Sequence, residues 1–313
     1  MADTPSHPGT PLIPDSDTDT DLIVVGGGPA GCAAARMAAG VGMRSVLIEP
    51  DILCRNLYRI PALDNVLGGH TSGPELADSI TTELKSTEPC RLELGRHATR
   101  LRAHDDHVAV TLDTGARLTA PYAIVATGVG PLQPADVSWI TDPTNRVLPP
   151  LWQADADDIQ GRTLLVLGGD RPIGTFLRAH PTADTRLLVA HPENDDYKVE
   201  EIRDDPRVML LPTRHLTLRT SEGAVTAEIV DRSGNQQTHT SDAAFLSIGS
   251  APVSPPGDLV RDEAGYCPPA DQHPRVMVAG DLRSARYQRI MTALGSGSEA
   301  ALRVYYAAQE LRM

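Results

Sequence analysis

The segment DLIVVGGGPAGCAAARMAAG, residues 21–40, constrains the fold more than any other part of this 313-residue chain. The apolar run at 22–25 has the length of a strand buried on both faces of a parallel sheet. Gly26, Gly28 and Gly31 follow at G-x-G-x-x-G spacing, and the small residues after them predict a helix to residue 40. These glycines let the strand turn, the backbone approach a pyrophosphate and the helix lie close to the sheet.

A second strand and an acid complete the pattern. Residues 45–49, SVLIE, form the next predicted strand, and Glu49 closes it about 20 residues after the turn. An acid at this place hydrogen-bonds a ribose hydroxyl, while the pyrophosphate rests on the N-terminus of the helix. Residues 21–49 therefore predict a dinucleotide-binding βαβ unit.

Composition limits the class of protein. The length accommodates two domains, and the formal net charge of -13 argues against a nucleic-acid partner, which needs clustered Lys and Arg. No apolar run approaches the ~20 residues that span a bilayer, and the start of the chain has no signal-peptide pattern. We therefore expect a cytoplasmic protein with no membrane partner. Residues 1–20 are rich in Pro, Thr and Asp and are expected to form a disordered leader.

The four cysteines are scattered, with no C-x-x-C pair and no histidine at metal-ligand spacing. The sequence thus predicts no metal site and no disulfide framework. Cys32 falls within the predicted helix and is expected only to pack. We assign no partner to Cys90 or Cys267.

Later segments favour FAD over NAD as the dinucleotide. Residues 107–128 alternate like a small antiparallel excursion and end in the apolar strand AIVATG. Near the C-terminus, RVMVAGD forms another apolar strand that ends in Gly280 and Asp281 and precedes a helix.

The order GGGPAG, ATG, a second glycine turn, FLSIGSAP and VMVAGD with MTALGSGSEAA resembles the low-molecular-weight thioredoxin reductase family, from about residue 20 to the C-terminus. The resemblance implies a two-domain α/β fold, with a doubly wound FAD-binding domain and a smaller inserted α/β domain of the nicotinamide-binding type. It places the FAD-binding domain at 20–135 and 245–313 and the insert at 136–244. A homodimer is also expected.

The resemblance further implies which positions hold FAD. They are Gly26, Gly28, Pro29, Ala30 and Gly31 at the pyrophosphate, Glu49 at the adenosine ribose, Ala98 at the adenine, Asn65 beside the flavin, Thr127 and Gly128 at the ATG crossing, and Gly280 and Asp281 at the ribityl chain.

The helix at 286–301 matches the family segment whose first turn touches the flavin pyrimidine, with Arg289 and Ile290 there. The family's Arg-Gln order is reversed here to Gln288-Arg289. A helix N-terminus or Arg289 near the flavin C2 oxygen would stabilise the reduced anion. The alternative is a helix that only packs.

The second turn, VLGGDRPIG at 166–174, departs from the family pattern G-G-G-x-x-A. Asp170 replaces a glycine where the backbone must meet a pyrophosphate, and like charges ~4 Å apart cost on the order of 1 to 4 kcal/mol. The family's arginines for a 2'-phosphate are replaced by HPENDDYK, which starts at His191 and carries Glu193, Asp195 and Asp196. The sequence predicts that NADPH does not bind. An ordinary solvated loop is the alternative interpretation of this segment.

The redox-active cysteine pair of the family is also missing, because no cysteine lies between Gly128 and Thr163. A dithiol relay needs one sulfur to attack and one to resolve. A shorter match, CRN at 54–56 with GGHTSGPEL, resembles the dithiol oxidases found beside natural-product pathways, and adds Arg55 and Asn56 as cofactor-side residues. Those enzymes also use a C-x-x-C pair.

Two side chains are candidates for catalysis. Cys54 lies in the loop that by resemblance passes near the flavin, and the positive charge of Arg55 would favour its thiolate. His70 follows two glycines on the same side and could act as a general base. A packing cysteine and an ordinary histidine are the alternatives.

The chain is therefore expected to be an FAD-dependent oxidoreductase that oxidises a small molecule by two electrons, with oxygen or an electron-carrier protein as acceptor. Natural-product tailoring is one setting for such a reaction. Alternatives are a ferredoxin:NAD(P) reductase, a ferredoxin-fed reductase of the same fold, and a non-catalytic FAD-binding module.

Overall fold

The computed structural model describes residues 20–154, 156–221 and 223–310, which divide into two compact units. Unit 1 comprises the chain up to Gly128 and again from Pro252, and unit 2 comprises Val129–Ala251. The insert is thus longer at both ends than the predicted 136–244. The predicted leader lies almost entirely outside the described residues.

Unit 1 is built on a parallel sheet in the order β18-β7-β1-β2-β3. Its strands are Val276–Val278, Tyr122–Val125, Leu22–Val25, Ser45–Glu49 and Cys90–Leu94. The predicted strands at 22–25 and 45–49 are confirmed residue for residue. All four residues of β1 are buried, as a strand covered on both faces requires.

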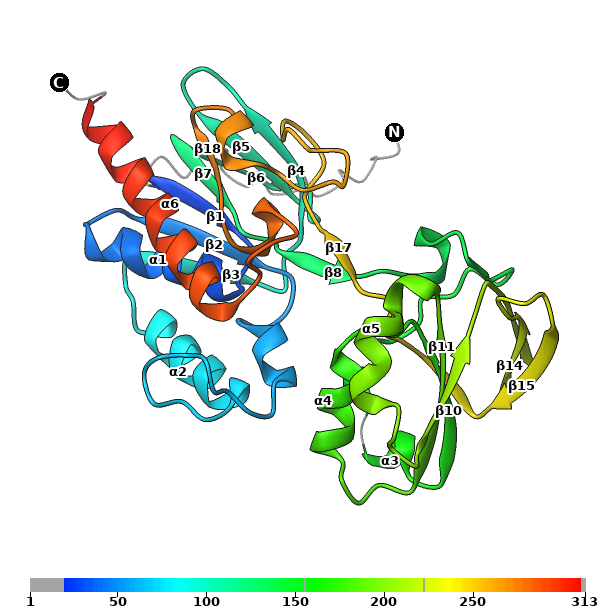
Figure 1. Cartoon of the computed structure of the whole chain (residues 1–313). Coiled ribbons are helices and arrows are strands. Elements are labelled where there is room, and N and C mark those ends of the chain that lie inside the picture. Colours follow the sequence, from blue (N-terminus) through cyan, green and yellow to red (C-terminus); the bar gives the residue numbers. More distant parts are fainter. Residues whose placement is uncertain (1–19, 155, 222, 311–313) are drawn as a thin grey trace, which may run out of the picture. The chain divides into compact units, whose positions relative to one another are not determined.

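Helices and a second sheet cover the two faces of this sheet (Figure 1). α1 (Pro29–Gly40), α2 (Gly73–Lys85) and α6 (Ile290–Glu310) pack on one face. The antiparallel strands β4 (Ala98–Ala103), β5 (Val108–Leu112) and β6 (Arg117–Ala120) cover the other. Because side chains alternate between the two faces of a strand, Leu22 and Val24 point to the helices, while Ile23 and Val25 point to the antiparallel strands.

Unit 2 repeats this three-layer plan. Its parallel sheet has the order β12-β11-β10-β16, formed by Val208–Pro212, Thr185–His191, Arg162–Leu167 and Ala243–Leu246. α3 (Ala156–Ile159), α4 (Pro172–Ala179) and α5 (Asp196–Val199) belong to its helical layer. A second sheet is formed by β15 (Gln236–Ser241), β14 (Ala224–Val230), β13 (His215–Ser221) and β9 (Ile140–Thr141).

Where the chain passes between the units, β8 (Val129–Pro131) pairs with β17 (Ser250–Pro252). Short 3-10 helices connect the larger elements, at Arg55–Arg59, Pro134–Asp136, Leu151–Gln153, Glu193–Asp195, Glu200–Ile202, Pro269–Asp271 and Gly280–Arg283. Within the described part of the chain, no helix is both long enough and apolar enough to cross a membrane.

Candidate functional site

The first glycine turn requires glycine at two places for steric reasons. Gly26 has φ of +102°, and a Cβ there would lie 2.6 Å from the carbonyl oxygen of Ala126. A Cβ at Gly31 would lie 1.8 Å from the carbonyl oxygen of Gly26. The strand can therefore turn sharply into α1 only with glycine at these positions.

The third glycine leaves room for a ligand. A Cβ at Gly28 would meet no protein atom within 4 Å. Within the described residues, the backbone amides of Gly28, Ala30 and Gly31 donate to no other residue, and Cys32 makes the first helical bond, 2.9 Å to Gly28 O. Unused amides at a helix N-terminus form a site for a pyrophosphate, so this turn fits a dinucleotide.

Glu49 lies beside the turn as predicted. Its Oε2 accepts from the amide of Gly27 at 2.6 Å and its Oε1 from the amide of Asp51 at 3.0 Å. Burial raises the pKa of Glu49, and the two amides oppose this rise. The carboxylate is held in one orientation at the end of β2, where a ribose hydroxyl could donate to it.

Replacing Glu49 with Ala is expected to weaken FAD binding, because the ribose and the Gly27 amide both lose a charged acceptor. Hydrogen bonds to charged groups contribute roughly 1.5 to 3 kcal/mol, which is about a ten-fold to hundred-fold change in affinity. Equilibrium dialysis of FAD measures it. Glu83→Ala, which removes an exposed acid paired with Arg36, serves as control, and equal affinity of both variants would contradict the assignment.

The C-terminal residues of the site pack directly against the turn. A Cβ at Gly297 in α6 would lie 1.9 Å from the carbonyl oxygen of Ala30, so the two helices approach through a glycine. Ser296 accepts from the amide of Gly280 at 2.9 Å. Gly280 and Asp281 therefore stand next to the N-terminus of α1. Sequence reasoning did not single out Ser296 or Gly297, although the run GSGS inside a predicted helix was a signal of close packing.

Asp281 lies in the short helix after β18, whose residues Gly280–Arg283 begin beside Ala30. Burial raises the pKa of Asp281, while the charges of Arg283 and Arg289 lower it. A half-buried carboxyl group beside two cations is suited to accept a hydrogen bond from a polyol.

The remaining predicted residues of unit 1 fall into two groups. Ala98 is buried at the start of β4, Thr127 Oγ1 donates to the carbonyl oxygen of Val253, and Gly128 has φ of +68°. Asn56, Asn65 and Arg289 are exposed, and Ile290 opens α6. The residues of the first group are held within the fold of unit 1. In the second group, the exposed side chains of Asn56, Asn65 and Arg289 are available to a ligand.

Cys54 and Arg55 do not interact as predicted. The Arg55 guanidinium pairs with Asp51 at 2.8 Å on the surface, whereas the thiol of Cys54 is buried and lies 3.8 Å from the sulfur of Cys32. His70 is partly exposed, with Nδ1 4.0 Å from a carboxylate oxygen of Glu75. The sequence-predicted catalytic pair therefore consists of one buried thiol and one accessible imidazole.

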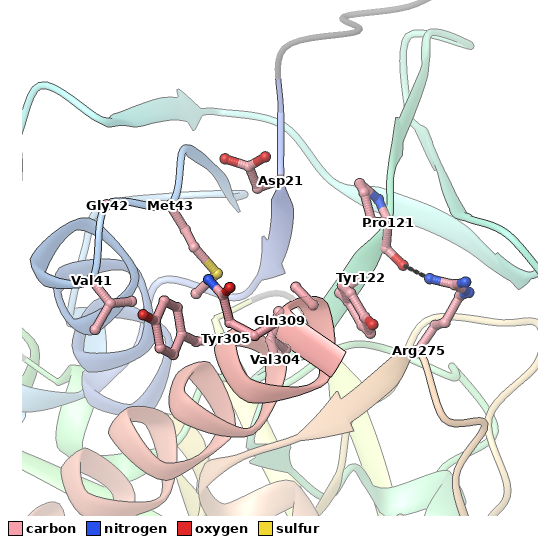
Figure 2. A pocket seen from close by; sticks show the side chains of 11 residues that line it. Asp21, Val41, Gly42, Met43, Pro121, Tyr122, Arg275, Val304, Tyr305 and Gln309 are labelled. Atoms are coloured by element: carbon pink, nitrogen blue, oxygen red, sulfur yellow. Dashed lines mark hydrogen bonds between the residues drawn. The ribbon is translucent and has the colours of Figure 1, made fainter. Parts of the chain in front are cut away.

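A separate pocket of about 240 Å³ lies in unit 1 (Figure 2). Asp21, Tyr122 and Arg275 line it, and each precedes or begins a strand of the parallel sheet. Arg275 donates to the carbonyl oxygen of Pro121 at 3.2 Å and stacks over the Tyr122 ring. Ligands of such sheets bind at the carboxyl ends of the strands, where the glycine turn lies. This pocket lies at the amino ends of the strands and is therefore not the dinucleotide site.

The second turn can be aligned with the first through one backbone hydrogen bond. Gly26 donates to the carbonyl oxygen of Ile48 at 2.9 Å, and Gly168 donates to that of Ala190 at 2.8 Å. In both units the donor follows the first strand and the acceptor lies in the next, parallel strand. Positions around the two turns therefore correspond one by one.

The correspondence identifies what replaced the binding groups. Asp170 stands where Gly28 stands in the first turn, and His191 stands where Glu49 stands. The substitution at Asp170 was found from the sequence alone. The replacement of the ribose-binding acid by His191 becomes apparent only when the first two parallel strands of each unit are aligned.

The three amides that are unused in the first turn are all lost in the second. Asp170 donates to the carbonyl oxygen of Ser247 at 3.0 Å, Pro172 has no N–H, and Ile173 donates to the carbonyl oxygen of Asp170 at 3.3 Å. A phosphate at this turn would have to displace bonds within the chain.

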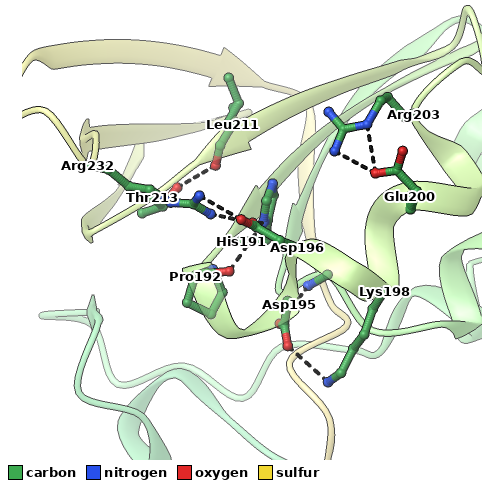
Figure 3. Close-up of polar contacts among 11 residues, drawn as sticks. His191, Pro192, Asp195, Asp196, Lys198, Glu200, Arg203, Leu211, Thr213 and Arg232 are labelled. Atoms are coloured by element: carbon green, nitrogen blue, oxygen red, sulfur yellow. Dashed lines mark hydrogen bonds and ion pairs between the residues drawn. The ribbon is translucent and has the colours of Figure 1, made fainter.

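Charged side chains also contact the second turn, and Figure 3 shows two of them, the ion pair of Asp195 and Lys198. Asp195 Oδ2 accepts from the amide of Gly169 at 3.1 Å, and Lys198 Nζ lies 2.9 Å from Asp195 Oδ1 and 3.4 Å from Asp170 Oδ1. The acidic loop is thus not simply a solvated segment. It binds back onto the turn, and Lys198 bridges Asp195 of the loop and Asp170 of the turn.

His191 is buried, and its Nδ1 lies 3.3 Å from the carbonyl oxygen of Pro192 and 3.4 Å from Asp196 Oδ1. Within the described residues, its Nε2 has no hydrogen-bond partner. Burial lowers the pKa of His191, and the charge of Arg232 adds to this, while the Pro192 carbonyl, Asp196 and Asp195 oppose it.

Unit 2 is therefore expected to lose stability as the pH falls below about 6.5, where the unfolded chain takes up the proton that buried His191 resists. One such group contributes at most about 1.4 kcal/mol per pH unit. Both tryptophans, Trp139 and Trp152, lie in unit 2, so urea unfolding followed by tryptophan fluorescence reports on it. His191→Gln should flatten the dependence between pH 7.5 and 5.5, and the exposed control His97→Gln should not. Equal slopes in both variants would refute the role of His191.

The similarity to known proteins extends over both units. Residues 20–169 match the family model described as pyridine nucleotide-disulphide oxidoreductase. This range is just under half of the chain. The match agrees with the predicted family, with FAD as the cofactor and with an FAD-dependent oxidoreductase as the class of enzyme.

Two curated relatives match most of the chain. It is 27% identical over 321 residues to an NADH dehydrogenase of Ferdinandcohnia aciditolerans, covering 96% of this chain and 60% of the relative. It is 25% identical over 308 residues to one of the alkyl hydroperoxide reductase subunits of Xanthomonas campestris pv. phaseoli, covering 91% and 56%. The chain thus spans less than two thirds of the length of these relatives.

Solved structures confirm the predicted fold. Thioredoxin reductase from Lactococcus lactis has a TM-score of 0.77 at 20% identity, covering 93% of this chain and 99% of that one. Bacillithiol disulfide reductase from Staphylococcus aureus has a TM-score of 0.66 at 14% identity, covering 92% and 98%.

Proposed function

We propose that this chain uses FAD to oxidise a small molecule by two electrons, and that oxygen or an electron-carrier protein reoxidises the flavin. The proposal rests on the second glycine turn. In the first turn the backbone amides of Gly28, Ala30 and Gly31 are free to bind a pyrophosphate. The corresponding residues of the second turn, Asp170, Pro172 and Ile173, offer no free amide. A nicotinamide dinucleotide then has no preformed pyrophosphate site, and the electrons must come from another donor.

The positions of the cysteines support the same proposal. Residues 129–251 contain no cysteine, so unit 2 cannot carry a dithiol relay to a protein substrate. All four thiols belong to unit 1, where they are buried and free. Reduction of a thioredoxin-like partner through unit 2 is therefore not part of the proposal.

Residues of unit 1 would carry the reaction. The amides at the start of α1 and Glu49 would bind the cofactor, and Asp281 would accept a hydrogen bond from its polyol chain. FAD supplies the two-electron acceptor. His70 would take up the substrate proton, because its imidazole is partly exposed.

Anaerobic flavin bleaching tests this function. The purified protein should be yellow, and its flavin should be bleached by a small-molecule donor from a metabolite panel that includes dithiols and free thiols, then recover its colour on admission of oxygen or of an oxidised carrier. Bleaching by NADH would instead favour the activity named for the F. aciditolerans relative. Bleaching by NADPH would favour a ferredoxin:NAD(P) reductase, and bleaching only by reduced ferredoxin would favour a ferredoxin-fed reductase.

A further inference from the structure

Two cysteines far apart in the sequence meet behind the dinucleotide turn. Cys32 lies in the first turn of α1 and Cys54 precedes the short helix Arg55–Arg59, yet their sulfurs are 3.8 Å apart. Each residue is only 1% exposed. They are free thiols, and the Cys54 S–H donates to the Cys32 sulfur.

Both residues bind the same carbonyl group of the turn. The thiol of Cys32 donates to Gly27 O at 3.2 Å, and the backbone amide of Cys54 donates to it at 2.8 Å. The amide of Gly27 in turn donates to Glu49 at 2.6 Å. A chain of hydrogen bonds therefore runs from Cys54 through Cys32 and Gly27 to the acid at the ribose position.

The loop that carries Cys54 is tightly packed and held in an uncommon conformation. Cys54 has φ of +55°, a region that residues with a Cβ seldom occupy. A Cβ at Gly27 would lie 2.7 Å from Leu53 Cδ2, so the residue before Cys54 rests on the turn. Any shift of Cys54 therefore moves atoms that touch Gly27.

We propose that Cys32 and Cys54 are a redox-sensitive pair whose disulfide lowers the affinity of unit 1 for FAD. The oxidant is hydrogen peroxide. The Cys54 thiolate attacks one peroxide oxygen and forms a sulfenic acid, releasing water after proton uptake. The Cys32 sulfur then attacks the Cys54 sulfur, and the hydroxyl group leaves as a second water. Two thiols and one peroxide thus give one disulfide and two waters.

The order of these steps follows from the surroundings of Cys32. The hydrogen bond from Cys54 and burial raise the pKa of the Cys32 thiol, and the neighbouring Glu49 and Cys90 act in the same direction. A thiol with a raised pKa is less readily ionised and so less readily oxidised, which assigns the second step to Cys32.

Disulfide formation changes the turn in two ways. The sulfurs must approach from 3.8 Å to about 2.05 Å, which draws residue 54 and Leu53 towards α1. The Cys32 thiol proton is also consumed, so Gly27 O loses one of its two donors. Both changes act on the peptide group of Gly27, whose amide positions Glu49. If a displaced Glu49 loses its charged hydrogen bond to the ribose, the dissociation constant of FAD rises about ten-fold or more.

The test is peroxide treatment of the purified flavoprotein, followed by peptide mapping without reduction and by gel filtration to measure retained FAD. We expect a peptide cross-linked through Cys32 and Cys54, an FAD dissociation constant raised about ten-fold, and recovery with dithiothreitol. Cys54→Ser and Cys54→Ala, each compared with its own untreated sample, should keep their FAD under peroxide. Cys90→Ser and Cys267→Ser, as matched controls, should still lose it.

Three outcomes would overturn the proposal. One is that peroxide oxidises Cys90 or Cys267 without linking Cys32 to Cys54. Another is that the disulfide forms and FAD affinity is unchanged. The third is that Cys54→Ser and Cys54→Ala lose FAD under peroxide as readily as the unmodified chain. Because FAD retention is the readout, the result does not depend on which substrate the enzyme oxidises.

Discussion

Neither NADH nor NADPH is expected to bleach the bound flavin at a useful rate under anaerobic conditions. Asp170 and Ile173 use their amides within the chain, and Pro172 has none. Losing even two of these three hydrogen bonds to a charged phosphate costs roughly 3 to 6 kcal/mol, which is about a hundred-fold or more in affinity. Stopped-flow mixing at micromolar nicotinamide measures this, and fast bleaching by either compound would contradict it.

Variants of the second turn sharpen this prediction. Asp170→Gly removes the carboxylate that Lys198 holds but leaves Pro172 and His191 in place, so it should recover little nicotinamide binding. Arg178→Ala, an exposed change on α4, is the control. If Asp170→Gly alone restored rapid bleaching, the lost amides would not be what prevents binding.

Gly31→Ala is expected to destabilise unit 1 and remove FAD. Its Cβ would lie 1.8 Å from the carbonyl oxygen of Gly26, so α1 would have to move away from the sheet. Overpacking of a buried site typically costs 1 to 3 kcal/mol, and a clash with backbone lies at about the upper end of that range. Thermal unfolding by circular dichroism and flavin content measure the two effects.

Gly28→Ala provides the matched contrast. Its Cβ would meet no protein atom, so unfolding should change little, but the methyl group would point into the space that the pyrophosphate needs. Gly40→Ala, at the end of α1, should affect neither property because its Cβ would meet only the tip of Arg36 at 3.8 Å. A stable, fully flavinated Gly31→Ala protein would show that the turn is assigned to the wrong residues.

Much of unit 1 was predictable because local rules and tertiary structure agree there. The strands at 22–25 and 45–49 and the helix ending at Gly40 appear as predicted. Spacing alone identified Gly26, Gly28 and Gly31, although only Gly31 is required by a residue close in sequence, since Gly26 is required by Ala126 and Gly28 leaves space for a ligand. The antiparallel excursion within 107–128 also formed, as β5 and β6, and the chain then enters the parallel sheet as β7.

Unit 2 was less predictable because its decisive contacts join distant residues. Asp170 was visible as a substituted glycine, but its amide is bound by Ser247, 77 positions later, and that pairing depends on β16 lying beside β10. From the sequence alone, the acids after His191 were interpreted as a surface loop that repels the 2'-phosphate of NADPH. Asp195 in fact accepts a hydrogen bond from the amide of Gly169, as Glu49 does from the corresponding amide of Gly27 in the first turn.

The sequence by itself indicated the family resemblance, the cofactor and the glycine turn of unit 1, because G-x-G-x-x-G spacing and a terminal acid are local consequences of one strand, one helix and one phosphate. It also determined that unit 2 has no dithiol, since absence of cysteine is a fact of composition. Only the tertiary structure decided which amides remain free, that His191 occupies the ribose-acid position, and that Cys32 and Cys54 are neighbours. Hydrogen bonds and sulfur contacts depend on distances between segments, and these are set by sheet register and helix packing rather than by spacing along the chain.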